Sequence, residues 1–136
     1  MEITDGDGIW AHPGDERHFS GRVWMAELAA AGAPGACEVM SVHFAPGART
    51  AWHSHPEGQL LHVTAGSGMV KSAEGEPREI RAGYTVRAAP GERHWHGATA
   101  GHPMTHLAIQ PTGTEWFEHV TEAEYREAGE RARSRG

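Results

Sequence analysis

The fold is decided by one stretch of the sequence, Gly47-Ala48-Arg49-Thr50-Ala51-Trp52-His53-Ser54-His55-Pro56-Glu57-Gly58-Gln59-Leu60-Leu61-His62-Val63-Thr64-Ala65-Gly66. His53 and His55 stand two residues apart, and Gln59 follows four residues later. Because residues i and i+2 of a β-strand point to the same side, the two imidazoles should converge inside a sheet-lined cavity. Gln59 can reach that point from the next strand, after a turn at Pro56-Glu57-Gly58. The stretch therefore predicts half of a metal site.

Length and composition point to one domain built from many short strands. The chain has 136 residues, which suits a single hydrophobic core. It contains 18 glycines and 8 prolines, and this density of turn-forming residues favours short strands over long helices. It also contains 11 histidines, more than a surface population readily explains. The excess of imidazoles favours a metal-binding protein.

Charge, hydropathy and cysteine content exclude several classes of partner. The formal net charge of −6 argues against nucleic acid, which requires a basic surface. No apolar run approaches the roughly 20 residues of a membrane span, and the first residues lack the pattern of a signal peptide. Cys37 is the single cysteine, so no internal disulfide is possible. We therefore expect a cytoplasmic protein with a small-molecule substrate and neither a nucleic-acid nor a membrane partner.

Alternating apolar and polar residues, separated by turn signals, predict an all-β sandwich or barrel. A loop is expected at 29–36, and a tight turn is expected at Ala65-Gly66-Ser67-Gly68. The expected strands are 19–28, 37–44, 49–55, 59–64, 69–72, 78–80, 84–88, 93–98, 102–110 and 116–120.

Three regions are expected along the chain. Residues 1–20 form an N-terminal arm, with a short strand near Ile9-Trp10, that can cross onto a second subunit. Residues 21–120 form the barrel, and residues 121–136 form a C-terminal helix and tail. The helix begins with Thr121-Glu122-Ala123-Glu124, a capping box in which each end residue satisfies the backbone N–H of the other. It should run from about residue 122 to residue 131.

Later strands supply the second half of the site. His94 and His96 fall on one face of the strand at 93–98, with Trp95 on the other, and His106 shares a face with Ala108 and Gln110. Neutral imidazole is a common ligand of zinc, iron, manganese, nickel and copper. Three imidazoles and one side-chain oxygen, with coordination positions left open, are typical of a catalytic site.

Two motifs resemble those of the cupin family. Gly47-x5-His53-x-His55-x3-Gln59-x6-Gly66 is similar to the first cupin motif, and Gly83-x6-Pro90-x3-His94 is similar to the second. The resemblance implies a small double-stranded β-helix, or jelly-roll, barrel. Gln59 stands where a glutamate is usual, and the usual proline-to-histidine interval would end on Trp95. We place the ligand at His94, because tryptophan does not bind metal.

Four segments resemble the bacterial cupin-type hydroxynitrile lyases more closely: 47–53, 90–98, 104–110 and 116–121. The resemblance implies one divalent metal, Mn2+ before Fe2+, Zn2+ or Ni2+, and the dimers or tetramers usual among small cupins imply a homodimer or homotetramer. The implied metal ligands are His53, His55, Gln59 and His94, and the implied acid–base residues are His96 and His106. The expected substrate pocket contains Met40, Val42, Thr50, Ala108 and Gln110.

The neutral Gln59 favours Lewis-acid chemistry, because an amide ligand leaves the full charge of a divalent metal uncancelled. We expect a lyase in which His96 takes the hydroxyl proton of a cyanohydrin and His106 hydrogen-bonds or protonates the leaving cyanide, or the reverse. The alternatives are another cupin enzyme, such as a dioxygenase, isomerase or decarboxylase, and a non-catalytic binding protein. Gln59 as a buried amide, His96 as support for a ligand and His106 as a core histidine remain open. Trp52 and Trp95 are expected in the core or at a subunit interface.

Overall fold

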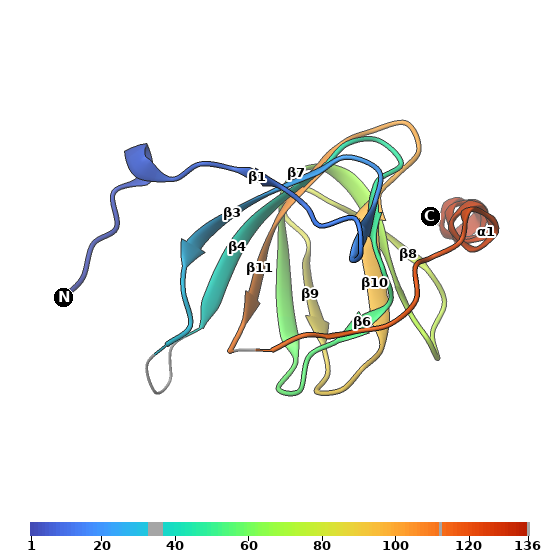
Figure 1. Cartoon of the computed structure of the whole chain (residues 1–136). Helices are drawn as coiled ribbons and strands as arrows, with labels where there is room; N and C mark the ends of the chain where they lie inside the picture. The colour runs from blue at the N-terminus through green and yellow to red at the C-terminus, as the bar shows by residue number, and fades with distance from the viewer. Residues whose placement is uncertain (33–36, 112, 136) are drawn as a thin grey trace.

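The computed structural model describes residues 1–32, 37–111 and 113–135. Its strands form a strongly curled sheet, and in these described residues one α-helix lies against the outside of the sheet (Figure 1). The expected all-β fold with a short C-terminal helix is thereby confirmed. The strands are β1 (His12–Pro13), β2 (Phe19–Ser20), β3 (Val23–Ala29), β4 (Glu38–Phe44), β5 (Arg49–Thr50), β6 (His53–Ser54), β7 (Gln59–Ser72), β8 (Arg78–Arg81), β9 (Thr85–Ala88), β10 (His94–Ala98), β11 (Met104–Gln110) and β12 (Glu115–Trp116).

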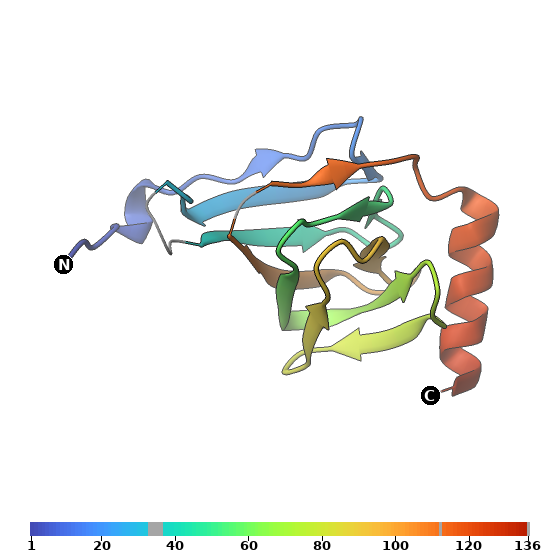
Figure 2. The same ribbon diagram turned by 90° about the horizontal axis from the view of Figure 1, so that it is seen from below.

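The long strand β7 joins the two halves of the sheet (Figure 2). Its first half pairs with β11 and β9, and its second half pairs with β10 and β8. The chain therefore does not reverse at Ala65–Gly68, and the tight turn expected there is wrong. Instead, the pairing register with β11 shifts between Thr105 and His106, and this bulge bends β7 from one half of the sheet into the other.

Glycine is required within β7 for conformation and for space. Gly66 has a φ of 76°, a left-handed value that side chains with a Cβ disfavour. A Cβ at this position would also collide with the backbone carbonyl of Pro103. The glycines that suggested a turn in the sequence thus permit a bend and a close approach between backbones.

Several element boundaries differ from the predictions. The N-terminal strand lies at His12–Pro13 rather than near Ile9-Trp10, and a short 3-10 helix, η1 (Gly6–Gly8), precedes it. The last strand, β12, is limited to Glu115–Trp116. Of the loop expected at 29–36, residues 33–36 lie outside the described residues.

The described residues form two apolar cores, one on each side of the curled sheet. The inner core is built around Phe44, Leu61 and Met104. The outer core contains Trp52 and Trp95, which pack with Tyr125 and Ala128 of the C-terminal helix. Both tryptophans are therefore core residues, as one of the two expectations had it. The side chains of successive residues of β10 thus point to opposite faces of the sheet.

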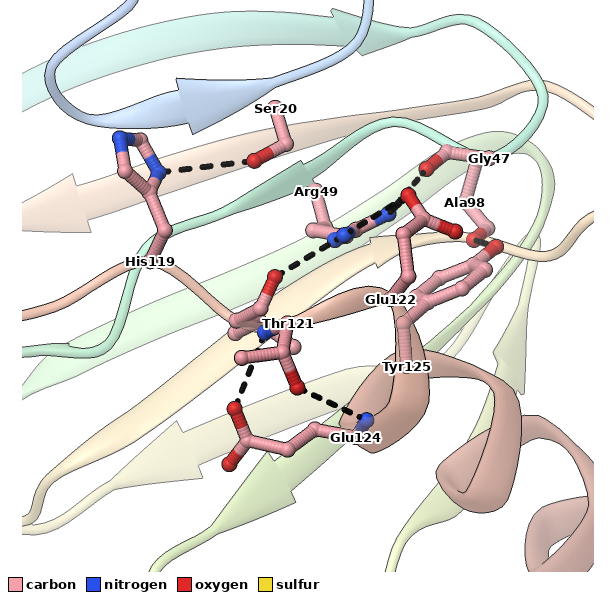
Figure 3. Close-up of polar contacts among 10 residues, drawn as sticks. Ser20, Gly47, Arg49, Ala98, His119, Thr121, Glu122, Glu124 and Tyr125 are labelled. Atoms are coloured by element: carbon pink, nitrogen blue, oxygen red, sulfur yellow. Dashed lines mark hydrogen bonds and ion pairs between the residues drawn. The ribbon is translucent and has the colours of Figure 1, made fainter.

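The helix α1 (Glu122–Arg135) is longer than expected and is anchored at its first turn (Figure 3). The capping box is confirmed: the Thr121 N–H donates to Glu124 Oε1 at 3.0 Å, and the Glu124 N–H donates to Thr121 Oγ1 at 3.1 Å. The buried Arg49 donates to Val120 O at 2.9 Å and to Glu122 Oε1 at 3.1 Å. In the described part of the chain, no helix is long and apolar enough to cross a membrane.

Candidate metal centre

Histidines from β6, β10 and β11 and from the loop after β6 meet inside the curled sheet. His53 of β6 pairs directly with His94 of β10, which places their side chains beside one another. The centres of these two rings are 4.4 Å apart, and the centre of the His55 ring lies 5.1 Å from that of His53. His96 and His106 complete the group, and all five are 3% exposed or less. Burial of so many imidazoles is costly unless they share a ligand or a hydrogen-bond network.

Backbone carbonyls orient three of these rings. The Nδ1 atoms of His53, His55 and His94 lie 2.9, 3.0 and 2.8 Å from the carbonyl oxygens of Ala51, Gly113 and Glu92. Because a carbonyl oxygen only accepts, each Nδ1 carries the proton and each Nε2 keeps a lone pair. This tautomer is the one in which imidazole binds a metal through Nε2, with its second nitrogen held by a backbone group.

Gln59 contributes an oxygen to the same place. Its Oε1 atom lies 3.1 Å from His94 Nε2, while its amide nitrogen donates to Gln110 Oε1 at 2.9 Å. Two lone-pair atoms therefore face one another without a proton between them. A shared cation resolves this contact, since ligands about 2.1 Å from one ion and at right angles are separated by about 3 Å. The donor set fits a divalent metal.

The tightest grouping of imidazoles differs in one member from the predicted ligand set. One ring nitrogen each of His53, His94 and His96 lies within 4.8 Å of the other two. These buried histidines can hold a metal ion. His55 is not in this group, yet it has the carbonyl-bound Nδ1 that His96 lacks. In the described chain, the Nε2 atoms of both His55 and His96 are buried without a hydrogen-bond partner.

His96 is bound to His106 rather than to the backbone. His106 Nε2 and His96 Nδ1 lie 2.9 Å apart. The backbone N–H of His96 donates to Thr50 Oγ1, with 3.3 Å between the nitrogen and the oxygen. His106 is completely buried beside Phe44, with their ring centres 5.2 Å apart. The two histidines form a pair that joins the metal-ligand region to the inner core.

Burial keeps all five histidines neutral near pH 7. Desolvation lowers the pKa of His53 and of His96 well below the usual value of 6.5, and neighbouring imidazoles lower both further. Burial lowers the pKa of His106 to about 4. It also lowers the pKa of His55 and of His94. Neutral imidazoles are able to bind a metal or to accept a proton.

The site opens into a cavity of about 190 Å3. All five predicted pocket residues, Met40, Val42, Thr50, Ala108 and Gln110, line it. The lining also includes residues that sequence reasoning missed: Phe19, Met25, Glu38, Thr114 and Trp116. Met25 could have been found from the sequence, because it follows Val23 by two residues and therefore lies on the same inward face of β3. The remaining four come from strand ends and loops, where no periodic pattern indicates which way a side chain points.

Comparison with known proteins agrees with this arrangement. The model of the cupin domain family matches residues 40–110, which include both histidine motifs. The chain belongs to the cupin family. This cupin is 48% identical over 130 residues to (R)-mandelonitrile lyase of Granulicella tundricola, covering 93% of this chain and 99% of that relative. The family resemblance inferred from the motifs is confirmed.

Solved structures share the cupin fold. The crystal structure of a cupin-like protein from Thermotoga maritima has a TM-score of 0.82 and 39% identity, covering 87% of this cupin and 92% of that chain. A predicted oxalate decarboxylase from the same organism has a TM-score of 0.71 and 21% identity, covering 85% of this chain and 100% of the other. The second likeness concerns the fold alone.

Proposed function

We propose that this cupin is a metal-dependent hydroxynitrile lyase, which cleaves a cyanohydrin into a small aldehyde and HCN and catalyses the reverse addition. The observation that carries the proposal is the buried, unpartnered Nε2 of His96, whose ring lies beside those of His53 and His94. The 48% identity to an (R)-mandelonitrile lyase over nearly the whole chain supports the same reaction.

The metal would be held by His53, His55, His94 and Gln59. The three histidines share the backbone-bound Nδ1, and the Gln59 oxygen faces His94. We propose Mn2+ as the occupant, because the resemblance to the cupin-type hydroxynitrile lyases implies it and the oxygen of Gln59 suits it; the three imidazoles also suit Fe2+, Zn2+ or Ni2+. When bound, the ion supplies a Lewis acid that lowers the pKa of a substrate hydroxyl, and the neutral Gln59 leaves its charge uncancelled.

His96 moves the proton. Its Nε2 takes the hydroxyl proton of the cyanohydrin while Nδ1–H donates to His106 Nε2, so His106 stabilises the imidazolium. The electron pair of the oxygen forms the carbonyl, and the carbon–carbon bond breaks with its pair leaving on cyanide. His96 Nε2–H then protonates cyanide to HCN, which restores the starting state. His106 thus acts through His96 as a positioning residue.

The pocket selects a mostly apolar carbonyl compound. Its lining includes Phe19, Met25, Met40, Val42, Ala108 and Trp116. The hydroxyl of Thr50 already accepts from the His96 backbone, so its own hydrogen is free to point at substrate. An aromatic or short aliphatic aldehyde suits this surface.

The proposal is tested by mandelonitrile cleavage under anaerobic conditions. We expect oxygen-independent release of benzaldehyde from the Mn2+-loaded protein, loss of that activity after chelation and recovery on adding Mn2+. A reaction that requires Fe(II) and O2, or a protein that binds no divalent metal, would overturn it.

A further inference from the structure

An acidic side chain at the cavity wall is linked to Gln59 through a second glutamine. Gln59 Nε2 donates to Gln110 Oε1 at 2.9 Å, and Gln110 Nε2 donates to Glu38 Oε2 at 2.8 Å. Gln59 and Gln110 are 6% and 5% exposed. Glu38 and Gln110 are directly paired residues on β4 and β11, so the sheet register itself holds this contact together.

The chemistry of Glu38 sets the direction of the whole chain of hydrogen bonds. A carboxylate only accepts, so the Gln110 amide must turn its NH2 group toward Glu38. The Gln110 carbonyl then faces Gln59 and accepts from its NH2 group. Gln59 is left with its oxygen toward His94 and the metal-ligand region. A flipped Gln59 would offer an NH2 group, which cannot bind a cation.

We propose that Glu38 is a positioning residue that acts through Gln110 to keep the Gln59 oxygen directed at the metal. The inference rests on the metal site of the proposed function. It explains how an amide, whose two ends differ little in shape, serves in place of a carboxylate whose two oxygens are equivalent. Supporting residues of this kind change metal affinity about 10-fold to 100-fold when they are replaced.

A purely electrostatic role for Glu38 predicts a different result. If its negative charge simply attracts the cation, Glu38→Gln weakens binding to the same extent whatever residue occupies position 59. If Glu38 acts by positioning, the effect of Glu38→Gln on metal affinity depends on which residue occupies position 59. In Gln59→Glu, the carboxylate at position 59 requires the Gln110 NH2 group, so the Gln110 oxygen is turned onto the Glu38 carboxylate. Glu38→Gln then removes this repulsion between two oxygens, because the NH2 group of the new glutamine can donate to the Gln110 oxygen.

The test measures the Mn2+ dissociation constant from the EPR signal of free Mn2+, without reference to activity. Four proteins are compared: the unaltered chain, Glu38→Gln, Gln59→Glu and the double variant. We expect Glu38→Gln to weaken Mn2+ binding on the order of tenfold in the unaltered background and to strengthen it in the Gln59→Glu background. Gln110→Leu, which keeps the Glu38 charge but cuts the link, should weaken binding as Glu38→Gln does.

Glu27→Gln is the matched control, since it removes the same charge from an exposed residue of the neighbouring strand β3. Its Mn2+ affinity should equal that of the unaltered protein. Equal losses for Glu38→Gln in both backgrounds, or no loss in either, would overturn the positioning role while leaving the metal site intact. Failure of the unaltered protein to bind Mn2+ would overturn the metal site itself.

Discussion

The Nε2 atom of His106 lies 2.9 Å from the Nδ1 atom of His96, so the two rings share one proton. In the described chain, neither His96 Nε2 nor His106 Nδ1 has a hydrogen-bond partner. A neutral imidazole has a single N–H, so the position of the shared proton decides whether His96 Nε2 accepts or donates. The pair can therefore take a proton at one atom and return it from the same atom.

Removal of either histidine should lower turnover, and the two losses should not add. We expect His96→Ala to reduce kcat about 100-fold or more, and His106→Leu to reduce it about 10-fold, because His106 only stabilises protonated His96. The double variant should match His96→Ala. Steady-state kinetics at equal metal content would measure this, and multiplicative losses would show that His106 acts on the substrate independently.

Metal content should separate His55 from His96. Because His55 has the backbone-bound Nδ1 typical of a ligand, His55→Ala should lose at least about tenfold in Mn2+ affinity. His96→Ala should keep its metal while losing turnover. Elemental analysis after gel filtration would measure both. The opposite result would assign the ligands to the tight group of His53, His94 and His96.

The metal-free protein should lose stability as the pH falls below about 6.5. Burial lowers the pKa of His53, His55, His94, His96 and His106 in the folded state. Between the unfolded value of 6.5 and the folded one, about 4 for His106, the unfolded chain binds more protons. The free energy of unfolding is therefore not reduced by these histidines above pH 6.5. As the pH falls below that value, it declines by up to about 1.4 kcal/mol per pH unit for each such group.

Urea denaturation of the chelated protein between pH 7.5 and 4.5 would measure this slope. His106→Leu should flatten it, whereas His12→Leu, at an exposed position, should leave it unchanged. A slope that does not respond to His106→Leu would show that other groups control the acid transition.

Gly66→Ala should destabilise the fold more than Gly83→Ala. Both glycines have a positive φ, 76° and 94°, so each substitution introduces backbone strain of about 1 kcal/mol. Only at Gly66 would the added Cβ also meet a backbone carbonyl, while the space at Gly83 is open. We expect a loss of at least about 2 kcal/mol at Gly66. Equal losses in thermal or urea denaturation would contradict the steric contribution.

The N-terminal arm should hold subunits together. The chain begins well away from the curled sheet (Figure 1), and Ile3 and Trp10 are 85% and 76% exposed. Apolar side chains in solvent favour burial against a partner, and we propose a second copy of this chain as that partner. Removal of residues 2–10 should shift a homodimer or homotetramer to smaller species in light scattering. Glu16→Ala, at an exposed position of the same region, should not.

The sequence was most informative where a pattern is local. The two-residue spacing of His94 and His96 correctly indicated a strand with inward imidazoles. The spacing of His53 and His55 correctly indicated two buried imidazoles, but the strand β6 ends at Ser54 and His55 lies in the loop that follows. The glycines near Gly66 misled, because a tight turn and a bend within one strand require the same backbone freedom. Glu38 was missed for a physical reason: its contact with Gln110 depends on the register of β4 against β11, which no local pattern specifies.

The inner and outer cores leave β10 with no exposed residue, since all five of its positions are buried. His94 and His96 face the candidate metal centre. Trp95 packs in the outer core against the helix α1. This strand therefore has almost no freedom to diverge. The pocket positions Met25, Met40 and Val42 lie on β3 and β4, two strands that also contain half-buried and exposed positions. New substrate preferences should arise there, and the proposed acid–base pair of His96 and His106 should persist through such changes.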